Sequence, residues 1–332
     1  MRTLSIAFAA SLLLCSPALA GGEGWLHNLE EAKKKAKAEN KDILIDFTGS
    51  DWCGWCIRLK KEVWDTEAWK AEGPKRYVLV ELDYPRKTPQ SEETKKYNDA
   101  IQREFGVRGF PTIALLDSEG QPYGMTGYQK GGPEAYLKHL EELAGRKGEI
   151  KQLLEGAKDA KALDDAMQQL AKWRVAFGYP SVQEKIVELD PKNEAGFGLK
   201  HAKALAMRAS AKKDDAAYKK HLEQVRAMDS GAATALEADV AANALIQELE
   251  SKLGPMAKSG DWAGALKLLQ TDYVPNHKEG AKGQVVGFFV GICKIRSNDK
   301  EGALAEFRAA KAMAEGTRIS KQIDQILKQL GG

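Results

Sequence analysis

The 332-residue sequence is poor in the features that would place it in several large classes of protein. Its four cysteines are too few for a fold held together by disulfides. Its formal net charge of +3 is small, so neither nucleic acid nor an anionic membrane is an expected partner. No apolar run reaches the length of a membrane-spanning helix. With 43% hydrophobic and 29% charged residues, the composition is typical of a soluble globular protein with two domains.

The first 20 residues have the pattern of a secretory signal peptide. Arg2 precedes the short apolar stretch Leu4–Leu14, and small residues lead to a predicted cleavage after Ala20. Cys15 follows a bulky residue, which disfavours a lipid-attachment site. We therefore expect an exported protein, periplasmic or extracellular, that keeps three cysteines after cleavage.

Apolar segments and helical patterns alternate between residues 21 and 145. The predicted strands are Asp42–Thr48, Tyr77–Leu82, Ile113–Leu116 and Tyr123–Gly127. The predicted helices are Gly24–Asn40, Ile57–Trp69, Ser91–Phe105 and Pro133–Leu143. This alternation predicts a three-layer α/β domain over residues 21–145.

From residue 146 to residue 332 the strand pattern is replaced by amphipathic helices. The predicted helices are Ile150–Arg174, Val182–Leu189, Glu194–Lys212, Ala216–Met228, Ala232–Leu253, Trp262–Leu269, Gln284–Arg296, Lys300–Ala314 and Ile319–Leu330. The segment that begins at Asp261 is similar to the one that begins at Asp299, and Glu188–Ala195 looks like the turn between tetratricopeptide repeats. We predict an all-α, tetratricopeptide-like domain, although a generic helical bundle fits the pattern nearly as well.

The motif Trp52-Cys53-Gly54-Trp55-Cys56 follows a predicted buried strand and begins a helix. A cysteine at a helix N-terminus is stabilised as the thiolate, which is the nucleophile in disulfide exchange. Two intervening residues place Cys56 about one helical turn further on. The motif therefore predicts a redox-active pair in which Cys53 attacks and Cys56 resolves the mixed disulfide.

The cysteine pair has three other possible interpretations. A zinc site needs a second pair of ligands, and neither the one further cysteine nor the unpaired histidines provide it. A c-type haem site needs His after the second cysteine, where this chain has Ile57. A structural disulfide would hardly need the strand–turn–helix context. We expect no metal and no cofactor, and we interpret Cys293, in an apolar helix, as a buried, inert thiol.

Two motifs in order resemble the thioredoxin superfamily. The strand Ile43–Phe47 leads into the cysteine motif, and Val107–Thr112 contains Gly109-Phe110-Pro111-Thr112. The resemblance covers about Trp25–Leu143, and the string that ends at Cys53 is similar to exported bacterial thioredoxin-like proteins. It implies a thioredoxin fold, a central mixed sheet flanked by helices, ahead of the tetratricopeptide-like helical domain.

The resemblance also implies roles for residues outside the cysteine pair. Pro111 matches the family's cis-proline beside the disulfide, where the backbone of Phe110 would meet a substrate strand. Asp46 matches the buried aspartate that moves protons at the second cysteine. The segment from Asp46 to Cys53 is one residue longer than in classical thioredoxin, so a strand-end residue with a solvated or hydrogen-bonded carboxylate is an equal alternative.

The expected catalytic residues are Cys53, Cys56, Pro111 and Asp46, and the expected substrate-binding residues are Trp52, Gly54, Trp55 and Phe110. Trp55 stands where classical thioredoxin has proline, and it would widen the apolar rim of the site.

Two classes of function fit this reading. The first is an exported thiol–disulfide oxidoreductase, reductive in direction, that acts on protein substrates with cysteines or disulfides and is served by an unidentified redox partner. The alternative is a protein-binding factor in which the helical repeats do the main work and the thioredoxin domain is a docking module. The presence of both cysteines favours the enzyme.

Overall fold

A computed structural model describes residues 24–315 and 317–331. The predicted signal peptide, residues 1–20, lies outside this range. The described chain divides into two compact units: an α/β unit of residues 24–158 and 165–179, and a helical unit of residues 159–164 and those from 180 onward. Residues 146–158 and 165–179 thus pack with the α/β unit, and an independently folding domain that ends at Gly145 remains a prediction.

The α/β unit is built on a four-stranded sheet in the order β2-β1-β3-β4. The strands are β1 (Asp42–Thr48), β2 (Tyr77–Asp83), β3 (Thr112–Leu116) and β4 (Pro122–Thr126). β1 pairs with β2 in parallel, whereas β3 is antiparallel to both β1 and β4. The predicted mixed sheet between helices is therefore confirmed.

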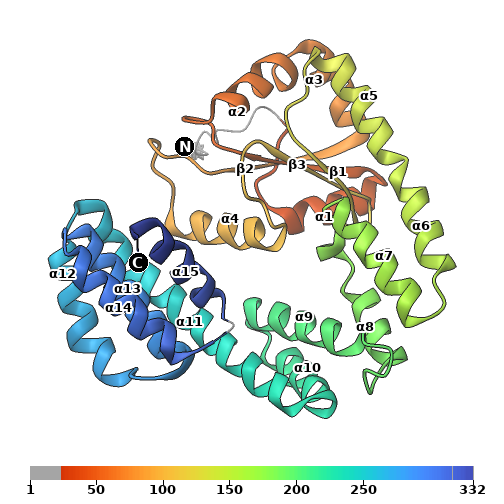
Figure 1. Ribbon diagram of the computed structural model, residues 1–332. Helices are drawn as coiled ribbons and strands as arrows, with labels where there is room; N and C mark the ends of the chain where they lie inside the picture. The colour runs from red at the N-terminus through yellow and green to blue at the C-terminus, as the bar shows by residue number, and fades with distance from the viewer. Residues whose placement is uncertain (1–23, 316, 332) are drawn as a thin grey trace, which may run out of the picture. The chain divides into compact units, whose positions relative to one another are not determined.

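Two layers of helices cover the sheet (Figure 1). On one face lie α1 (Leu29–Glu39) and α4 (Glu92–Glu104); on the other lie α2 (Gly54–Leu59), α3 (Glu67–Arg76) and α5 (Gly132–Ala144). Successive strand residues face opposite layers. Ile43, Ile45 and Phe47 pack in the core with α1, so Leu44, Asp46 and Thr48 face the layer that contains α2.

The single helix predicted over Ile57–Trp69 is wrong. The segment starts at Gly54 as α2, widens into the π-helical turn η1 (Lys60–Trp64) and stops, and α3 follows as a separate helix. Thr66 caps α3 because its side chain accepts the backbone N–H of Trp69. A threonine within a helical pattern is only a weak signal of a helix start, so this break was not predicted.

The C-terminal region is helical, as predicted. The helices after α5 are α6 (Arg146–Gly156), α7 (Ala160–Lys172), α8 (Pro180–Leu189), α9 (Gly198–Ala211), α10 (Asp215–Met228), α11 (Ser230–Ser259), α12 (Trp262–Leu268), α13 (Gly280–Arg296), α14 (Lys300–Met313) and α15 (Arg318–Leu330). Short helical turns also occur at η2 (Ala176–Gly178), η3 (Leu269–Tyr273) and η4 (Val274–Asn276). Across the described residues, no helix is both long and apolar enough to cross a membrane.

Residues beyond α7 explain why the α/β unit extends past α5. The ring of Phe177 lies 4.6 Å from that of Phe105 between centroids. The hydroxyl of Tyr179 donates to the backbone carbonyl of Pro122, at the start of β4, at 2.9 Å. These contacts bury aromatic surface against the sheet, so the helical character of the sequence does not mark the edge of the α/β unit.

The similar segments at Asp261 and Asp299 have the same local structure. Each aspartate caps a helix by accepting the N–H of the glycine three residues later, Gly264 or Gly302, at 2.8 Å. The same cap occurs where Asp214 accepts the N–H of Ala217, so it does not depend on glycine. The shared pattern is a helix-start signal, and it fits tetratricopeptide repeats only loosely.

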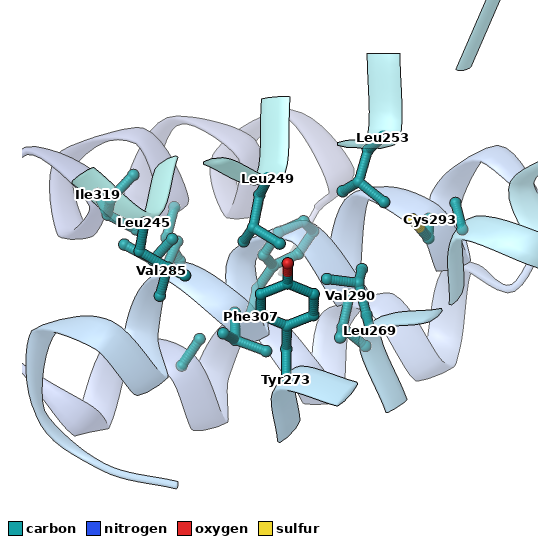
Figure 2. Close-up of a cluster of buried hydrophobic side chains, with 14 of the residues drawn as sticks. Leu245, Leu249, Leu253, Leu269, Tyr273, Val285, Val290, Cys293, Phe307 and Ile319 are labelled. Atoms are coloured by element: carbon teal, nitrogen blue, oxygen red, sulfur yellow. The ribbon is translucent and has the colours of Figure 1, made fainter. Parts of the chain in front are cut away.

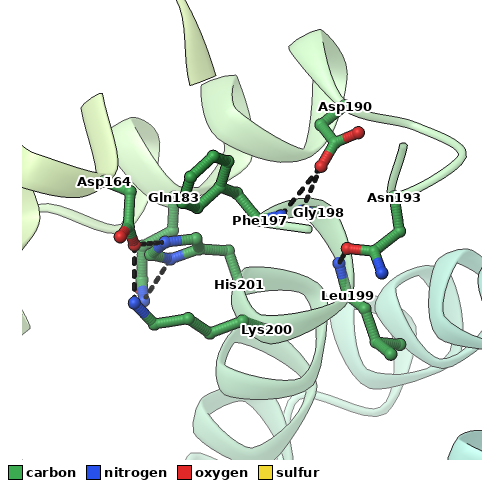
Figure 3. A network of polar contacts seen from close by, with 9 residues as sticks. All are labelled: Asp164, Gln183, Asp190, Asn193, Phe197, Gly198, Leu199, Lys200 and His201. Carbon is green, nitrogen blue, oxygen red and sulfur yellow. Dashed lines mark hydrogen bonds and ion pairs between the residues drawn. The ribbon is translucent and has the colours of Figure 1, made fainter. Parts of the chain in front are cut away.

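Two kinds of interaction hold the helical unit together. Helices α11 to α15 share an apolar core (Figure 2) whose members include Leu245, Leu249, Val285, Cys293, Phe307 and Ile319. Further towards the N-terminus, Asp164 binds His201 at 2.7 Å, while Asp190 accepts N–H groups of the turn before α9 (Figure 3). Cys293 is a free thiol, 2% exposed, and burial raises its pKa, as expected of an inert cysteine.

Candidate active site

Cys53 and Cys56 lie at the start of the helix that follows β1. Cys53 immediately precedes α2, and its Sγ accepts the backbone N–H of Cys56 at 3.2 Å. The two side chains form a disulfide, with Cα atoms 5.2 Å apart, and both are buried. Gly54 is exposed and is the first residue of α2. In the reduced protein, the sulfur of Cys53 would lie at the positive end of a helical segment, which stabilises a thiolate.

An exposed aromatic cluster borders the cysteines at Trp55. The indole of Trp55 is 56% exposed, and its centroid lies 5.1 Å from that of Tyr128. The guanidinium of Arg58 lies over both rings, 5.6 and 5.4 Å from their centroids. Glu62 accepts hydrogen bonds from Tyr128 and Arg58, which together lower the pKa of its carboxyl. The cluster presents exposed aromatic surface with a cation next to Cys56 in the chain.

Trp52, the residue before Cys53, is fixed by the loop that follows β2. Its Nε1 donates to the backbone carbonyl of Tyr84 at 2.8 Å, and the guanidinium carbon of Arg86 lies 3.6 Å from its ring centroid. Its ring also meets Phe110 at 5.8 Å between centroids. The indole is half-buried, so it shapes the rim of the site as well as offering a contact surface.

Asp51 ties the same loop to the cysteine motif. Its carboxylate accepts the backbone N–H groups of Arg86, Lys87 and Thr88 at 2.9, 2.8 and 2.7 Å. These hydrogen bonds, led by the one from Arg86, lower the pKa of Asp51 to about 2. The charged carboxylate therefore keeps Arg86 above Trp52 through the neutral pH range.

The Phe110–Pro111 peptide bond is cis, as the resemblance predicted. Pro111 directly precedes β3, and the ring of Phe110 lies between Trp52 and Tyr84, with the centroid of Tyr84 5.0 Å away. The structure thus brings the Phe110–Pro111 loop against the residue that precedes Cys53. The substrate-binding role of this loop remains a prediction.

Asp46 is buried in β1, 3% exposed, on the sheet face that α2 covers. Its Oδ2 accepts a hydrogen bond from Nε1 of Trp64 at 2.9 Å, and its Oδ1 has no hydrogen-bond partner among the described residues. Burial raises the pKa of Asp46 to about 7, although the Trp64 hydrogen bond and the charge of Lys60 act in the opposite direction. The carboxyl is therefore buried and hydrogen-bonded rather than solvated, and its role in proton transfer at Cys56 remains a prediction.

Four residues of this site were not identified from the sequence as site residues. Trp64 and Glu81 lie with Asp46 on the buried face, whereas Tyr128 and Arg86 lie on the exposed rim. Glu81 carried a detectable signal, because it is an acidic residue within an otherwise apolar strand. Tyr128 and Arg86 occupy loops, whose positions no periodic pattern predicts.

The side chains that could bind a metal ion are those of His, Cys, Asp and Glu. Within residues 24–315 and 317–331, no group of three or more His, Cys, Asp or Glu side chains is arranged to hold a metal ion.

Comparisons with known proteins show what the N-terminal region is similar to. Residues 29–144 match the thioredoxin-like domain family. The chain is 35% identical over 107 residues to the disulfide bond reductase DsbH of Chlamydia pneumoniae, covering 32% of this chain and 64% of that protein. It is 29% identical over 126 residues to the thioredoxin-related protein DsbJ of the same organism, covering 36% of each. A solved DsbH oxidoreductase is 30% identical, covering 41% of this chain and 94% of that one, with a TM-score of 0.35.

The chain therefore spans less than two thirds of the length of the curated relatives it matches. The family match ends at residue 144, near the end of α5. The similarity supports the fold and the cysteine site of the N-terminal region.

Proposed function

We propose that this protein, whose residues 29–144 form a thioredoxin-like domain, is an exported thiol–disulfide oxidoreductase that acts on protein substrates. The observation that carries the proposal is the disulfide between Cys53, at the start of α2, and Cys56. The proposed direction is reductive, and the relative named as a disulfide bond reductase supports it.

The proposed reaction uses the two sulfurs in turn. The thiolate of Cys53 attacks one sulfur of a substrate disulfide, and the other substrate sulfur leaves as a thiolate. Cys56 then attacks Cys53, so the bond between Cys53 and the substrate breaks and the substrate leaves fully reduced. The enzyme ends as the disulfide seen in the structure. A redox partner with a dithiol returns the two electrons.

The residues around the cysteines would hold the substrate during these steps. Phe110 and Pro111 would present backbone to an extended substrate segment, while Trp52 and Trp55 supply apolar surface on either side. Gly54 leaves the approach to Cys53 open, because a Cβ there would meet nothing within 4 Å.

The test is turnover of a disulfide-bonded protein, such as insulin, by the full mature chain with a dithiol as reductant. We expect catalysis, and a reduction potential for the Cys53–Cys56 pair towards the reducing end of the range of about −270 to −120 mV. A potential near the oxidising end would reverse the proposed direction. Binding of partner proteins without any turnover would instead favour the alternative, a helical protein-binding factor. N-terminal sequencing of the exported protein tests cleavage after Ala20.

Replacing Trp55 with Ala should weaken the binding of protein substrates. The exposed indole is held by Tyr128 and Arg58, so it offers a large apolar contact at little entropic cost. We expect KM for a protein disulfide to rise about tenfold, which corresponds to about 1.4 kcal/mol. The rate with a small disulfide such as oxidised glutathione should stay within about twofold. Equal losses with both substrates would contradict a role in substrate binding.

A further inference from the structure

Glu81 lies directly opposite Asp46 in the sheet. The parallel strands β1 and β2 pair these two residues in register. Neighbouring strands lie about 4.8 Å apart, and paired residues point to the same face. Both side chains therefore extend into the layer that contains α2, and they are only 3% and 7% exposed. Two acidic side chains share one buried region behind the cysteine pair.

Neither carboxyl is fully satisfied by hydrogen bonds. Among the described residues, Oδ1 of Asp46 and Oε1 of Glu81 have no hydrogen-bond partner. Two buried carboxylates cannot both be ionised at this spacing without a large repulsion, so one of them retains a proton at neutral pH. Burial, together with the charge of Asp46, raises the pKa of Glu81 to about 8.

The other charged and titratable groups that face the pair leave this conclusion unchanged. Those that act on one or both carboxyls, or contact their backbone, are Lys60, Asp65, Asp83, Tyr136 and His27. The cation of this set, Lys60, is bound to Asp65 at 3.1 Å, and its side chain is 41% exposed. It lowers the pKa of both buried carboxyls without outweighing their burial.

A surface hollow brings solvent close to Glu81. Its lining includes Lys60, Trp64 and Leu79. Leu79 precedes Glu81 by two residues in β2, so the two side chains lie on the same face. Trp64 is the residue that binds Asp46. Neither carboxyl lines the hollow, but Trp64 and Leu79, which do, neighbour Asp46 and Glu81, so the hollow brings water near the pair.

We propose that Glu81 is a positioning residue for disulfide exchange, which shares a proton with Asp46 and passes it to solvent at the hollow. The inference rests on the proposed function. When Cys56 resolves the mixed disulfide, its S–H proton moves to the carboxylate of Asp46. Its sulfur bonds to Cys53, and the electron pair of the broken bond leaves on the substrate sulfur. Glu81, which holds the shared proton, then releases it to water and takes the new proton from Asp46, so that Asp46 is again a base.

The test follows the carboxyl carbons of Asp46 and Glu81 by ¹³C NMR in the full oxidised chain as pH is raised. We expect the pair to titrate in two coupled steps separated by about one pH unit or more. In Glu81→Gln, Asp46 should titrate in a single step, because the second carboxyl of the pair is removed. Glu81→Met serves if the Gln variant does not fold. Glu141→Gln, an exposed charge on α5, should change neither titration.

The same variants are then compared in the rate at which Cys56 resolves a preformed mixed disulfide. The pH profile of the wild type should follow both steps of the pair, and in Glu81→Gln the upper step should disappear. Independent, single-step titrations in the wild type would overturn the proposal, and so would an unmoved rate profile. The NMR result does not depend on turnover, so absence of turnover would count against the proposed function and leave the carboxyl coupling measurable.

Discussion

Replacing Cys56 with Ala should turn the protein into a trap for its substrates. Cys53 would still attack a substrate disulfide, but no second sulfur would be available to release the product. Covalent adducts with substrate proteins should accumulate and disappear on reduction. Replacing Cys53 with Ala should yield no adducts, because the remaining sulfur is buried one turn inside the helix. Turnover by both variants should fall to the level of the reductant alone.

Non-reducing electrophoresis after acid quenching and alkylation measures these adducts, and mass spectrometry locates the linked cysteine. The matched control is Cys293→Ala. That thiol is buried and free in the helical unit, so its removal should alter neither trapping nor turnover. Trapping by the Cys53→Ala variant alone would reverse the assignment of attacking and resolving sulfur.

Replacing Asp46 with Asn should make the oxidised protein more stable at alkaline pH. Burial raises the pKa of Asp46 from 3.8 to about 7, so the folded protein holds a proton that the unfolded chain has released. The free energy of unfolding of the wild type therefore falls as pH rises from about 4 through about 7, by as much as about 4 kcal/mol from this group. Asn mimics the protonated acid, so this part of the pH dependence should disappear.

Urea denaturation of both oxidised proteins between pH 5 and pH 9, followed by tryptophan fluorescence, measures the difference. The stability curves should lie closest near pH 5 and separate as pH rises, with the variant above the wild type. Asp51→Asn is an instructive control, because the pKa of Asp51 is lowered to about 2. The contribution of the Asp51 carboxylate to the free energy of unfolding is present above the pKa that Asp51 has in the unfolded chain. It is lost only as pH falls towards 2. An unchanged slope in Asp46→Asn would show that Asp46 ionises normally.

The sequence predicted the elements that depend on local pattern. Four apolar segments became the four strands within one residue at each end, because buried strands need runs of branched and aromatic residues. The cysteine motif and Pro111 were found because their chemistry depends on order along the chain. The burial of Asp46 could not be decided, since it depends on Trp64 and on the helices that cover the sheet.

The helix boundaries failed where a single side chain outweighs periodicity. One helix was predicted over Ile150–Arg174, but the chain breaks into α6 and α7, and Asp159 caps the second by accepting the N–H of Ala162. The reverse occurs in α11, which was expected to stop at Leu253 before Pro255. It continues to Ser259, because tertiary packing of the helix compensates for the hydrogen bond that proline cannot donate.

The π-helical turn at Lys60–Trp64 determines how far the side chain of Trp64 is rotated about the helix axis from that of Cys56. In a regular α-helix each residue advances by about 100°, so eight residues after Cys56 the side chain would point about 80° away from it. The wider turn, closed by the bond from the N–H of Asp65 to the carbonyl of Lys60, advances by less per residue. Trp64 is thereby rotated back towards the face that carries Cys56, where it reaches Asp46. One extra residue in the turn therefore keeps two groups on the same side of this helical segment. They are the sulfur of Cys56 and the indole N–H of Trp64, which donates to Asp46.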